Sequence, residues 1–408
     1  MIHYVTTQGV GDAWVGNELR VVKKAGVPFR IHALNSPENT YFSSPDIVAM
    51  NDATNVLYPL PKLAVLAAFI AAPFRFRSQF FGALWNALTG PRESLRIRLV
   101  GVWHFMVACY WAAGLRSSQV SLIHSQWIHS AGTVAMYGAW LLDKPFSFTG
   151  HAADLFRNRQ ALSDKIRRAE FIICISEFHR QFFLKEGARK DQLHIAYCGL
   201  DLSHFAPQPP RDRGPDDPFH ILSAGRLVDK KGFDVLIRAC AILKDRQKHI
   251  RCTIEGSGPL EAPLRAQITD LGLEDVVTMS GTAIKQEDIP AFMASGDLYT
   301  LHCVWAPDND VDGLPQMLME AMACGRPSVS TRIVGIPDLV VHEDTGLLVE
   351  PDDNAEALAD ALQRLMEDPE LAEKLTARAR VHLKEKFNLD TCLEPLLSQY
   401  RARLEAQT

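Results

Sequence analysis

The sequence predicts an α/β protein with two domains, each built on a parallel β-sheet flanked by helices. Three observations favour this fold class. The chain has 408 residues, whereas a single hydrophobic core stops growing at roughly 250 to 300 residues. Short apolar runs alternate with helical-period segments almost from end to end, as in sheets assembled from strand-helix-strand units. A polar, proline-dense stretch, residues 206–218, separates two such series and can form neither a helix nor a central strand.

The first domain is expected to span residues 1–207 and the second residues 219–389, joined by a linker at 208–218. The expected strands are Ile2–Thr6, Val120–His124, Phe146–Thr149, Phe171–Ile175 and Leu193–Tyr197 in the first domain, and Phe219–Ala224, Ile250–Glu255, Val276–Met279, Leu298–His302 and Ser328–Ser330 in the second. A helix at about 390–408 is expected to pack back on the first domain. Because open parallel sheets bind ligands beyond the carboxyl ends of their strands, we expect the active site in a cleft between the two domains.

The composition is that of an ordinary globular protein. Hydrophobic residues make up 47% and charged residues 22% of the chain, which excludes the disordered and fibrous classes. A net charge of -5 argues against nucleic acid as a partner. The eight cysteines include no C-x-x-C pair and are expected to be reduced thiols. No secretory signal is visible after Met1, so a cytoplasmic location is expected.

The segment 62–116 is unusually basic. It holds one acidic residue, Glu93, against seven basic ones: Lys62, Arg75, Arg77, Arg92, Arg96, Arg98 and Arg116. Neither of its apolar stretches is a good membrane-spanning helix, since Leu63–Ala72 is too short and Leu99–Leu115 is borderline. Apolar side chains combined with arginines favour peripheral attachment to an anionic membrane surface, here the inner face of the plasma membrane. Buried domain helices are the alternative explanation.

A turn rich in cations follows the first strand of the second domain. The turn, Gly225–Gly232, precedes a helical run, Phe233–Lys244. Arg226 can hold two phosphate oxygens through its planar fork, while Lys231 supplies a compact charge. A solvated basic turn is the alternative. Another strand end carries small residues where a backbone can approach a nucleotide closely, namely Gly256, Gly258 and Pro259.

A short helix is expected at Gln316–Cys324, because Pro315 suits a first helical position and Gly325 a carboxyl cap. The free N–H groups and the positive dipole at its amino end favour an anionic sugar diphosphate. The residues expected to line the donor there are Gly313, Leu314 and Pro315.

Glu320 lies inside this otherwise apolar helix. A carboxylate is costly to bury unless it receives hydrogen bonds. A ribose diol would supply two donors, so Glu320 is a candidate for nucleotide binding. An exposed glutamate on a polar helix face is the alternative.

Two glycines, Gly9 and Gly11, follow the first strand of the chain. Their spacing is not G-x-G-x-x-G, and His32 and Ala33 stand where a dehydrogenase has its acidic residue, so a dinucleotide dehydrogenase is not expected. We interpret the glycines as a loop that approaches the donor phosphate or the acceptor, with a plain helix-entry turn as the alternative. His151 follows another strand and is expected to face the same cleft, unless it is a structural histidine.

Candidates for the acceptor site come from strand ends of the first domain. His124 and His129 flank Ser125-Gln126-Trp127, and Asp154 lies close after His151. For the two flanking histidines a structural role is the favoured interpretation.

Together these motifs closely resemble glycosyltransferase family 4, over nearly the whole chain. An acidic residue, seven positions and then Glu-Ala-Met-Ala-x-Gly-x-Pro match the family's Glu-x7-Glu signature, here from Asp312 to Glu320. Further matching motifs are Gly225-Arg226 with Lys231-Gly232, Gly256-x-Gly258-Pro259, Gly335–Val340, Thr345–Val349, Phe148–Asp154, and Cys198–Asp201 with Phe205. The first acidic position departs from the family, which usually has glutamate there, so the carboxylate of Asp312 sits one methylene further back.

The resemblance implies the GT-B architecture of two facing Rossmann-like domains, and a retaining, metal-independent transfer from a UDP-sugar or GDP-sugar. It implies that Glu320 binds the ribose, that Arg226 and Lys231 neutralise the diphosphate, and that His151 and Asp312 fix the sugar. The acceptor is expected to be a saccharide or a polyprenyl-linked saccharide of surface polysaccharide biosynthesis. The alternatives are a catalytically silent sugar-nucleotide-binding protein and a sugar-nucleotide epimerase.

One stretch of the second domain resembles part of a calcium-binding site. Asp308–Gly313 begins like a calcium-binding EF-hand loop, but the twelfth position is Met319 instead of glutamate, and Pro315 would obstruct the loop. This stretch is therefore not expected to bind a metal, in agreement with the metal-independent transfer that the resemblance implies, and no organic cofactor is expected.

Overall fold

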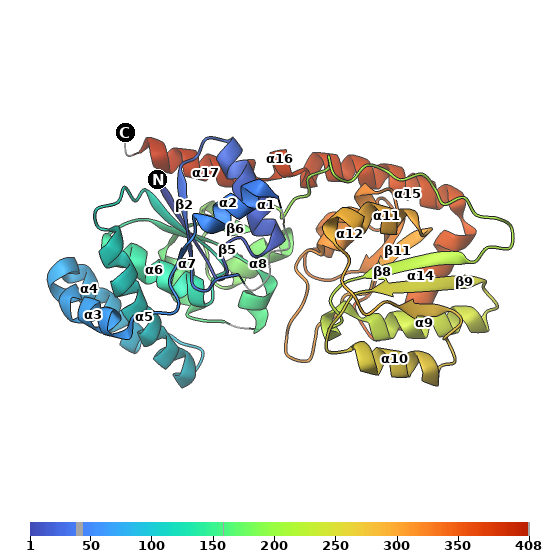
Figure 1. Cartoon of the computed structure of the whole chain (residues 1–408), viewed down its shortest axis with the longest axis horizontal. Coiled ribbons are helices and arrows are strands. Elements are labelled where there is room, and N and C mark those ends of the chain that lie inside the picture. Colours follow the sequence, from blue (N-terminus) through green and yellow to red (C-terminus); the bar gives the residue numbers. More distant parts are fainter. Residues whose placement is uncertain (38–43, 158, 407–408) are drawn as a thin grey trace. The chain divides into compact units, whose positions relative to one another are not determined.

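The computed structural model describes residues 1–37, 44–157 and 159–406 (Figure 1). The chain divides into two compact units, Met1–Cys198 with Cys392–Thr408, and Gly199–Thr391. The stretch expected to be a linker thus belongs to the second unit. The buried Arg326 explains this, because its guanidinium donates to the carbonyl oxygens of Gln208 at 2.6 Å and Pro209 at 2.7 Å.

The first unit contains a seven-stranded sheet in the order β3-β2-β1-β4-β5-β6-β7, with all neighbours parallel. Its strands are β1 (Ile2–Thr6), β2 (Phe29–Ala33), β3 (Asn55–Val56), β4 (Leu122–Gln126), β5 (Phe146–Gly150), β6 (Ala169–Cys174) and β7 (Leu193–Ile195). Every residue of β1, β4 and β5 is buried. Both faces of these strands are therefore covered, and the polar side chains of β5, Ser147 and Thr149, have His124 of β4 as their partner.

The helices of the first unit include three between β3 and β4, where a simple strand-helix-strand unit has one. The α-helices are α1 (Ala13–Lys24), α2 (Pro45–Asp52), α3 (Lys62–Phe76), α4 (Ser78–Thr89), α5 (Leu95–Leu115), α6 (Ser130–Leu142), α7 (Leu162–Arg168) and α8 (Glu177–Lys185). Helix α5 packs against α3, α4 and α6. Phe105, Trp111 and Tyr137 are buried at this junction, so the three helices between β3 and β4 share the core of the unit.

Among the described residues, α5 is the one helix long and apolar enough to cross a membrane by length and composition, with a mean hydropathy of 1.2 over its most apolar window. Of that window, 44% is buried inside the protein. The buried side chains include Phe105 and Trp111, so this face of α5 already has its apolar partners within the unit.

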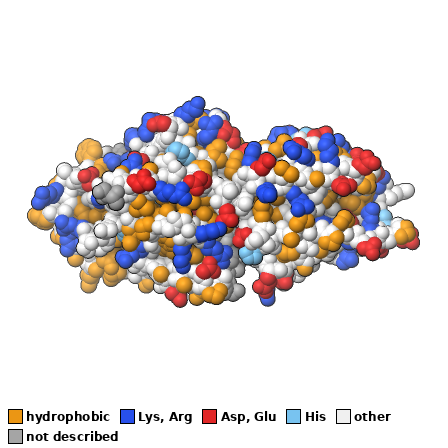
Figure 2. Space-filling view, turned by 90° about the horizontal axis from the view of Figure 1, so that it is seen from above, with side chains coloured by type: hydrophobic (Ala, Val, Ile, Leu, Met, Phe, Trp, Pro, Cys, Tyr) orange, Lys and Arg blue, Asp and Glu red, His pale blue; other side chains and the backbone are white. Residues whose placement is uncertain are grey.

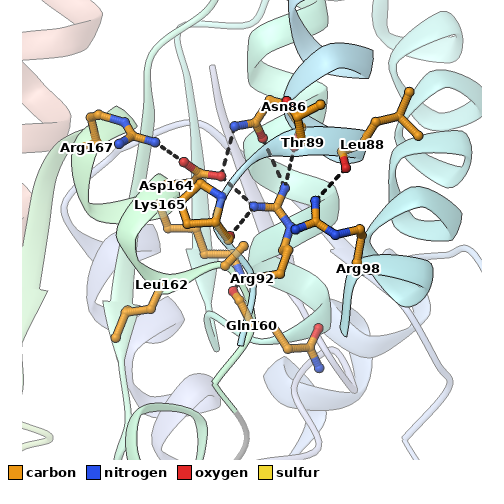
Figure 3. A network of polar contacts seen from close by, with 12 residues as sticks. Asn86, Leu88, Thr89, Arg92, Arg98, Gln160, Leu162, Asp164, Lys165 and Arg167 are labelled. Atoms are coloured by element: carbon orange, nitrogen blue, oxygen red, sulfur yellow. Dashed lines mark hydrogen bonds and ion pairs between the residues drawn. The ribbon is translucent and has the colours of Figure 1, made fainter. Parts of the chain in front are cut away.

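A buried polar network fixes the connection from α4 to α5 (Figure 3). Arg92 and Asp164 form an ion pair of 2.6 Å, with exposed side-chain fractions of 1% and 0%. Asn86 donates to the same carboxylate at 2.9 Å. Next to it the Lys165 ammonium donates to three carbonyl oxygens, those of Ile128, His129 and Gln160. Burial lowers the pKa of Lys165 to about 7. Such a network costs desolvation energy and stabilises one arrangement of its members only when all of them are satisfied.

The second unit contains a six-stranded sheet in the order β10-β9-β8-β11-β12-β13, again with parallel neighbours. Its strands are β8 (Phe219–Ala224), β9 (Ile250–Glu255), β10 (Val277–Met279), β11 (Leu298–Leu301), β12 (Ser328–Thr331) and β13 (Leu347–Val349). Its helices are α9 (Phe233–Asp245), α10 (Glu261–Asp270), α11 (Ile289–Ala294), α12 (Gln316–Ala323), α13 (Ile336–Leu339), α14 (Ala355–Glu367) and α15 (Pro369–His382).

The chain ends with α16 (Leu389–Cys392) and α17 (Glu394–Glu405). Helix α17 is part of the first unit and contacts β7. The ring of Tyr400 is fully buried and lies against His124 and Phe171. The last helix therefore completes the core of the unit in which the chain begins.

Candidate active site

Two loops of the second unit pack together beyond the carboxyl ends of β8 and β9. The N–H of Leu227 donates to the carbonyl of Ser257 at 2.9 Å. A Cβ on Gly256 would lie 1.9 Å from the carbonyl oxygen of Gly225, and one on Gly258 would lie 2.5 Å from that of Leu227. The glycines are thus required for these loops to approach each other. Their contact with a nucleotide, together with that of Pro259, stays a prediction.

The cationic turn between β8 and α9 carries a compact ion-pair cluster. Lys231 pairs with one oxygen of Asp312, and Lys230 lies 3.1 Å from the other. Lys230 also reaches Asp310 at 3.2 Å, so aspartates of the EF-hand-like stretch are bound by lysines. Sequence reasoning assigned Lys231 to the diphosphate and Asp312 to the sugar without foreseeing that they contact each other.

This pairing sets the protonation of both partners. Burial by itself lowers the pKa of Lys231, but Asp312 together with Cys303 and Asp310 outweighs it, so that the pKa is raised. Burial by itself raises the pKa of Asp312, but Lys231 and Lys230 outweigh it, so that this pKa is lowered. Both groups are therefore charged at neutral pH.

Arg226 is the free cation of this turn. Its side chain is exposed, and it forms no ion pair or side-chain hydrogen bond with a described residue. Its five N–H donors remain available to a ligand with oxygen acceptors.

Helix α12 begins at Gln316, as expected, and ends at Ala323, one residue earlier than expected. Pro315 is its N-cap and not its first helical residue. Proline has no side chain that can accept a hydrogen bond, and the helix start has no side-chain cap. Gly313 and Leu314, half-buried, lead into it. An uncapped helix start presents backbone N–H groups and the positive end of the helix dipole to an anion.

Glu320 is the distinctive residue of α12. Its side chain is buried, with 6% exposed, so the alternative of an exposed glutamate is wrong. No described residue donates a hydrogen bond to its carboxylate, and burial raises its pKa to about 7. A buried carboxylate without donors is unfavourable by itself and becomes favourable when a ligand supplies hydroxyl groups.

In the first unit, His151 lies among aromatic rings beyond the ends of β4 and β5. Its ring centroid is 4.0 Å from that of Trp14 and 4.9 Å from that of Trp127. Trp127 also stacks on His129, at 5.6 Å and an interplanar angle of 13°. Burial lowers the pKa of His151 to about 3, so the imidazole is neutral at physiological pH. The half-buried tryptophans give this cluster flat apolar faces that suit a sugar ring.

A chain of hydrogen bonds fixes the tautomer of His151. The Nε2 of Gln126 donates to both oxygens of Glu18, at 2.7 and 2.8 Å. The amide oxygen of Gln126 therefore faces Nε2 of His151, at 3.0 Å, and accepts its proton. Nδ1 of His151 then carries no proton and can accept a hydrogen bond from a hydroxyl group.

Two residues considered for the acceptor site are structural, which is the favoured interpretation for His124 and a correction for Asp154. His124 is fully buried within the sheet, and both ring nitrogens have partners, Ser147 at 2.8 Å and Thr149 at 3.2 Å. Asp154 is also fully buried, and its carboxylate accepts from the backbone N–H groups of Ile128 and, at 2.8 Å, of His151. Both residues hold the structure together and offer no surface to an acceptor.

The remaining candidates in the first unit are His129, Gly9 and Gly11. His129 caps α6, since its Nδ1 accepts from the N–H of Ser130 at 2.7 Å, and its ring is half-buried. Gly9 and Gly11 are buried in the turn between β1 and α1, and Gly9 has a φ of 59°, which favours glycine. Their contact with a ligand stays a prediction.

Sequence reasoning missed Trp14, Trp127, Gln126 and Glu18. Trp127 and Gln126 stand between His124 and His129, at a strand end that was already singled out. Trp14 likewise stands close to a strand end that was already considered, since it follows Gly11 by three residues. Aromatic residues next to strand ends were therefore a usable signal, whereas nothing local marks Glu18, which reaches Gln126 from the middle of α1.

Two family models match the chain. The model described as "Glycosyl transferases group 1" matches residues 207–382, and the one described as "Glycosyltransferase Family 4" matches residues 89–204. The two matches fall in different parts of the chain and together include both candidate regions around Glu320 and His151.

Individual relatives extend this likeness. The "Putative colanic acid biosynthesis glycosyltransferase WcaL" of Escherichia coli is 37% identical over 238 residues, which cover 58% of this chain and 57% of the relative. The chain likewise spans 54% to 59% of two further relatives, so it aligns with little more than half of their length. The D-inositol 3-phosphate glycosyltransferase of Pseudarthrobacter chlorophenolicus is 30% identical over 316 residues, covering 70% of this chain and 72% of the relative.

A solved structure shows the same fold over the full length. The crystal structure of HepE from Anabaena in complex with UDP has a TM-score of 0.69 and 17% identity, and the match covers 100% of both chains. The fold class expected from the sequence, GT-B with two Rossmann-like domains, is thereby confirmed.

Proposed function

We propose that this chain, which belongs to glycosyltransferase family 4, transfers a sugar from a nucleotide diphosphate to a saccharide or lipid-linked saccharide during surface polysaccharide biosynthesis. The description of the E. coli relative, which names colanic acid biosynthesis, supports this setting. The donor is a UDP-sugar or GDP-sugar, and the UDP named for the HepE structure supports the first of these.

Glu320 carries the proposal. A buried carboxylate with a pKa of about 7 and no donor from a described residue has its full hydrogen-bonding capacity left for a ligand. The two hydroxyl groups of a ribose match this capacity, because a carboxylate can accept from both. Binding would exchange an unfavourable buried charge for two charge-assisted hydrogen bonds.

The cations of the same unit fit the diphosphate. Arg226 is exposed and free to grip oxygens, and the uncapped start of α12 adds backbone N–H groups. During transfer the bond from the sugar to the diphosphate breaks, and negative charge grows on the leaving oxygen. Fixed cations and helix dipoles stabilise such growing charge without reorganisation. The proposed transfer retains configuration and needs no metal, with the leaving diphosphate taking the acceptor proton.

His151 is proposed to hold a hydroxyl group of the sugar. Its neutral ring and unprotonated Nδ1 can accept a hydrogen bond, and the nearby faces of Trp14 and Trp127 can pack against a pyranose. Asp312 is proposed to orient the sugar as well, within its cluster with the two lysines.

The helices of residues 62–116 are proposed to attach the protein to the cytoplasmic face of the membrane. Of sixteen exposed large hydrophobic side chains among the described residues, ten lie between Leu63 and Trp103. They form one stripe on each helix: Leu63, Leu66, Ile70 and Phe74 on α3, Phe81, Trp85 and Leu88 on α4, and Leu95, Leu99 and Trp103 on α5. Figure 2 shows hydrophobic and basic side chains next to each other at its left end. Both faces of α3 and α4 are apolar, which suits helices that have core on one side and lipid on the other.

The first experiment is nucleoside diphosphate release from a panel of UDP-sugars and GDP-sugars, with and without membrane extract and with and without EDTA. Wild type is compared with Glu320→Gln and with the control Glu373→Gln, which removes an exposed carboxylate on α15. We expect release from one donor that depends on extract, persists in EDTA, and falls at least tenfold in Glu320→Gln alone. Donors that bind without turnover in every condition would instead make this a sugar-nucleotide-binding protein.

A further inference from the structure

A basic groove lies at one end of the apolar helices of the first unit. It has a volume of about 480 Å³ and lies among the turn from α3 to α4, the end of α5 and the turn from α6 to β5. Four cations line it, namely Arg75, Arg77, Arg116 and Lys144, against one acidic residue, Asp143. Lys144 is far from the others in sequence, so the fold gathers a charge cluster that the basic segment 62–116 does not show by itself.

The four cations have no partners among the described residues. None forms an ion pair or donates a side-chain hydrogen bond there, and all four side chains are exposed. Other basic side chains of the unit do have acidic partners, as Arg92 has Asp164 and Arg180 has Glu177. Like charges gathered in one groove repel each other, so the cluster is favourable only with an anion in it.

The groove is continuous with the exposed apolar stripe. Phe74, whose side chain is 86% exposed, is the last member of the stripe on α3 and also lines the groove. Arg75 and Arg77 follow directly in sequence. Exposed apolar side chains are thus followed by cations within one helical turn. This arrangement matches the boundary between the acyl chains and the phosphates of a bilayer.

The helix ends do not account for the cluster. Helices α3, α5 and α6 end at Phe76, Leu115 and Leu142, and a cation near each end offsets the negative end of the dipole. Offsetting a helix dipole requires only the charge of each side chain. It leaves the N–H donors of the three arginines without acceptors. Those donors match phosphate oxygens, which arginine binds in pairs.

We propose that this groove binds the phosphate headgroup of an anionic phospholipid while the adjacent apolar stripe lies in the acyl layer. The inference rests on the membrane attachment proposed above and adds to it a site with charge selectivity. The groove shares no lining residue with the sites around His151 and Glu320, so the proposed lipid binding needs neither donor nor acceptor.

The test is flotation of the full chain with vesicles of phosphatidylcholine and with vesicles in which part of it is replaced by phosphatidylglycerol. Arg116→Glu/Lys144→Glu reverses two groove charges, and Lys185→Glu/Lys190→Glu makes the same change of net charge at exposed lysines outside the groove. We expect the groove variant to lose about tenfold or more of its affinity for anionic vesicles, since each basic residue near an anionic surface contributes measurably, and the control variant to lose less than about twofold.

Three further arms keep the outcomes distinct. Leu63→Ser/Trp85→Ser is expected to weaken binding to both kinds of vesicle, which tests the apolar stripe and the proposed attachment separately from the groove, because neither residue lines it. Millimolar inorganic phosphate is not expected to compete, whereas full competition would make the groove a site for free phosphate and overturn the lipid assignment. The proposal is also overturned if the groove variant binds anionic vesicles like wild type, or if both charge-reversed variants lose affinity equally. Thermal unfolding of each variant reports whether a loss comes from misfolding.

Discussion

The two units hold buried carboxylates in different ways. In the first unit, Glu18 receives hydrogen bonds from Tyr4 and Gln126, and Asp154 receives them from two backbone N–H groups. In the second unit, Glu320 is buried to the same degree as Glu18, 6% against 7% exposed, yet no described residue donates to it. Burial raises the pKa of both glutamates to about 7. Burial and pKa therefore do not separate a structural carboxylate from a ligand site; the source of the hydrogen-bond donors does.

Lys231 and Asp312 have partners within the protein, namely each other, yet both are proposed to act on the donor. Disruption of this pair has the largest expected effect on stability and on turnover. Lys231→Ala leaves Asp312 largely buried with Lys230 as its remaining partner. We expect unfolding by urea to show a loss of about 3 kcal/mol, since breaking a buried pair leaves an uncompensated charge. Donor turnover should fall at least tenfold, as when a preorganised cation is removed from a transition state.

The double variant Lys231→Met/Asp312→Leu separates the two roles of this pair. It should recover most of the stability, because neither charge is left alone, but none of the turnover. Recovery of both stability and turnover would show that the pair has only a structural role, like the Arg92–Asp164 pair of the first unit.

The ionisation of Glu320 provides the next prediction. Its pKa is raised from 4.5 to about 7 in the folded state, so the folded protein holds a proton between these values that the unfolded chain has lost. Stability should therefore decrease as pH rises from about 4.5 to 7, by roughly 3 kcal/mol relative to Glu320→Gln. Urea unfolding of both proteins at pH 5 and pH 8, without ligand, measures this difference. Parallel pH profiles would show that Glu320 already has donors within the protein.

Donor binding should depend on pH in the opposite direction. The ionised carboxylate accepts hydrogen bonds from the ribose, so the affinity for a nucleoside diphosphate should weaken as pH falls below about 7, by at most about tenfold per pH unit. Calorimetric titration of Glu320→Gln over the same range removes the contribution of the phosphate itself. The difference between the two profiles is then the contribution of Glu320.

Sequence patterns were sufficient for most of the fold. The ten expected strands all lie on observed ones, with ends displaced by at most two residues. Three strands were not among them. Strands β3 and β13 have only two and three residues and offer little pattern to detect, whereas the five residues of β2 alternate apolar and polar side chains and could have been recognised. The boundary at residue 207 differs from the unit boundary at Cys198, because Leu200 exchanges backbone hydrogen bonds of 2.9 and 3.0 Å with Phe387 and Leu389, which are far away in the sequence.

The candidate site was predictable where its residues are local to a motif. Glu320 could be placed on a short helix from the proline and glycine around it. The contact between Lys231 and Asp312 could not, since 81 residues separate them. The same holds for the hydrogen bonds from Glu18 to Gln126 and onward to His151, which depend on the order of strands in the sheet.

Glu18→Gln tests the buried glutamate that receives hydrogen bonds within the protein. A glutamine has one acceptor oxygen where Tyr4 and Gln126 supply donors, and its own amide hydrogens face those of Gln126. We expect a loss of about 1 to 2 kcal/mol in urea, the reverse of the gain expected for Glu320→Gln at pH 8. The affinity for a nucleoside diphosphate should stay at the wild-type value. A stabilised Glu18→Gln would mean that burial outweighs the donors and would remove the distinction between the two glutamates.

The smallest effect is expected for Arg226→Lys, compared with Arg326→Lys as a matched change at a buried arginine. Arg226 has no partner among the described residues, whereas Arg326 donates to three carbonyl oxygens, including that of Gly296 at 2.9 Å. The lysine at 226 keeps the charge and loses the fork, so KM for the donor should rise by about threefold to tenfold with unchanged urea unfolding. Arg326→Lys should instead lower stability and leave KM unchanged, because its hydrogen bonds join parts of the protein. Equal losses of stability in both variants would show that Arg226 has partners within the protein. Ligand-binding charges and structural charges of the second unit could then not be distinguished by their hydrogen-bond partners.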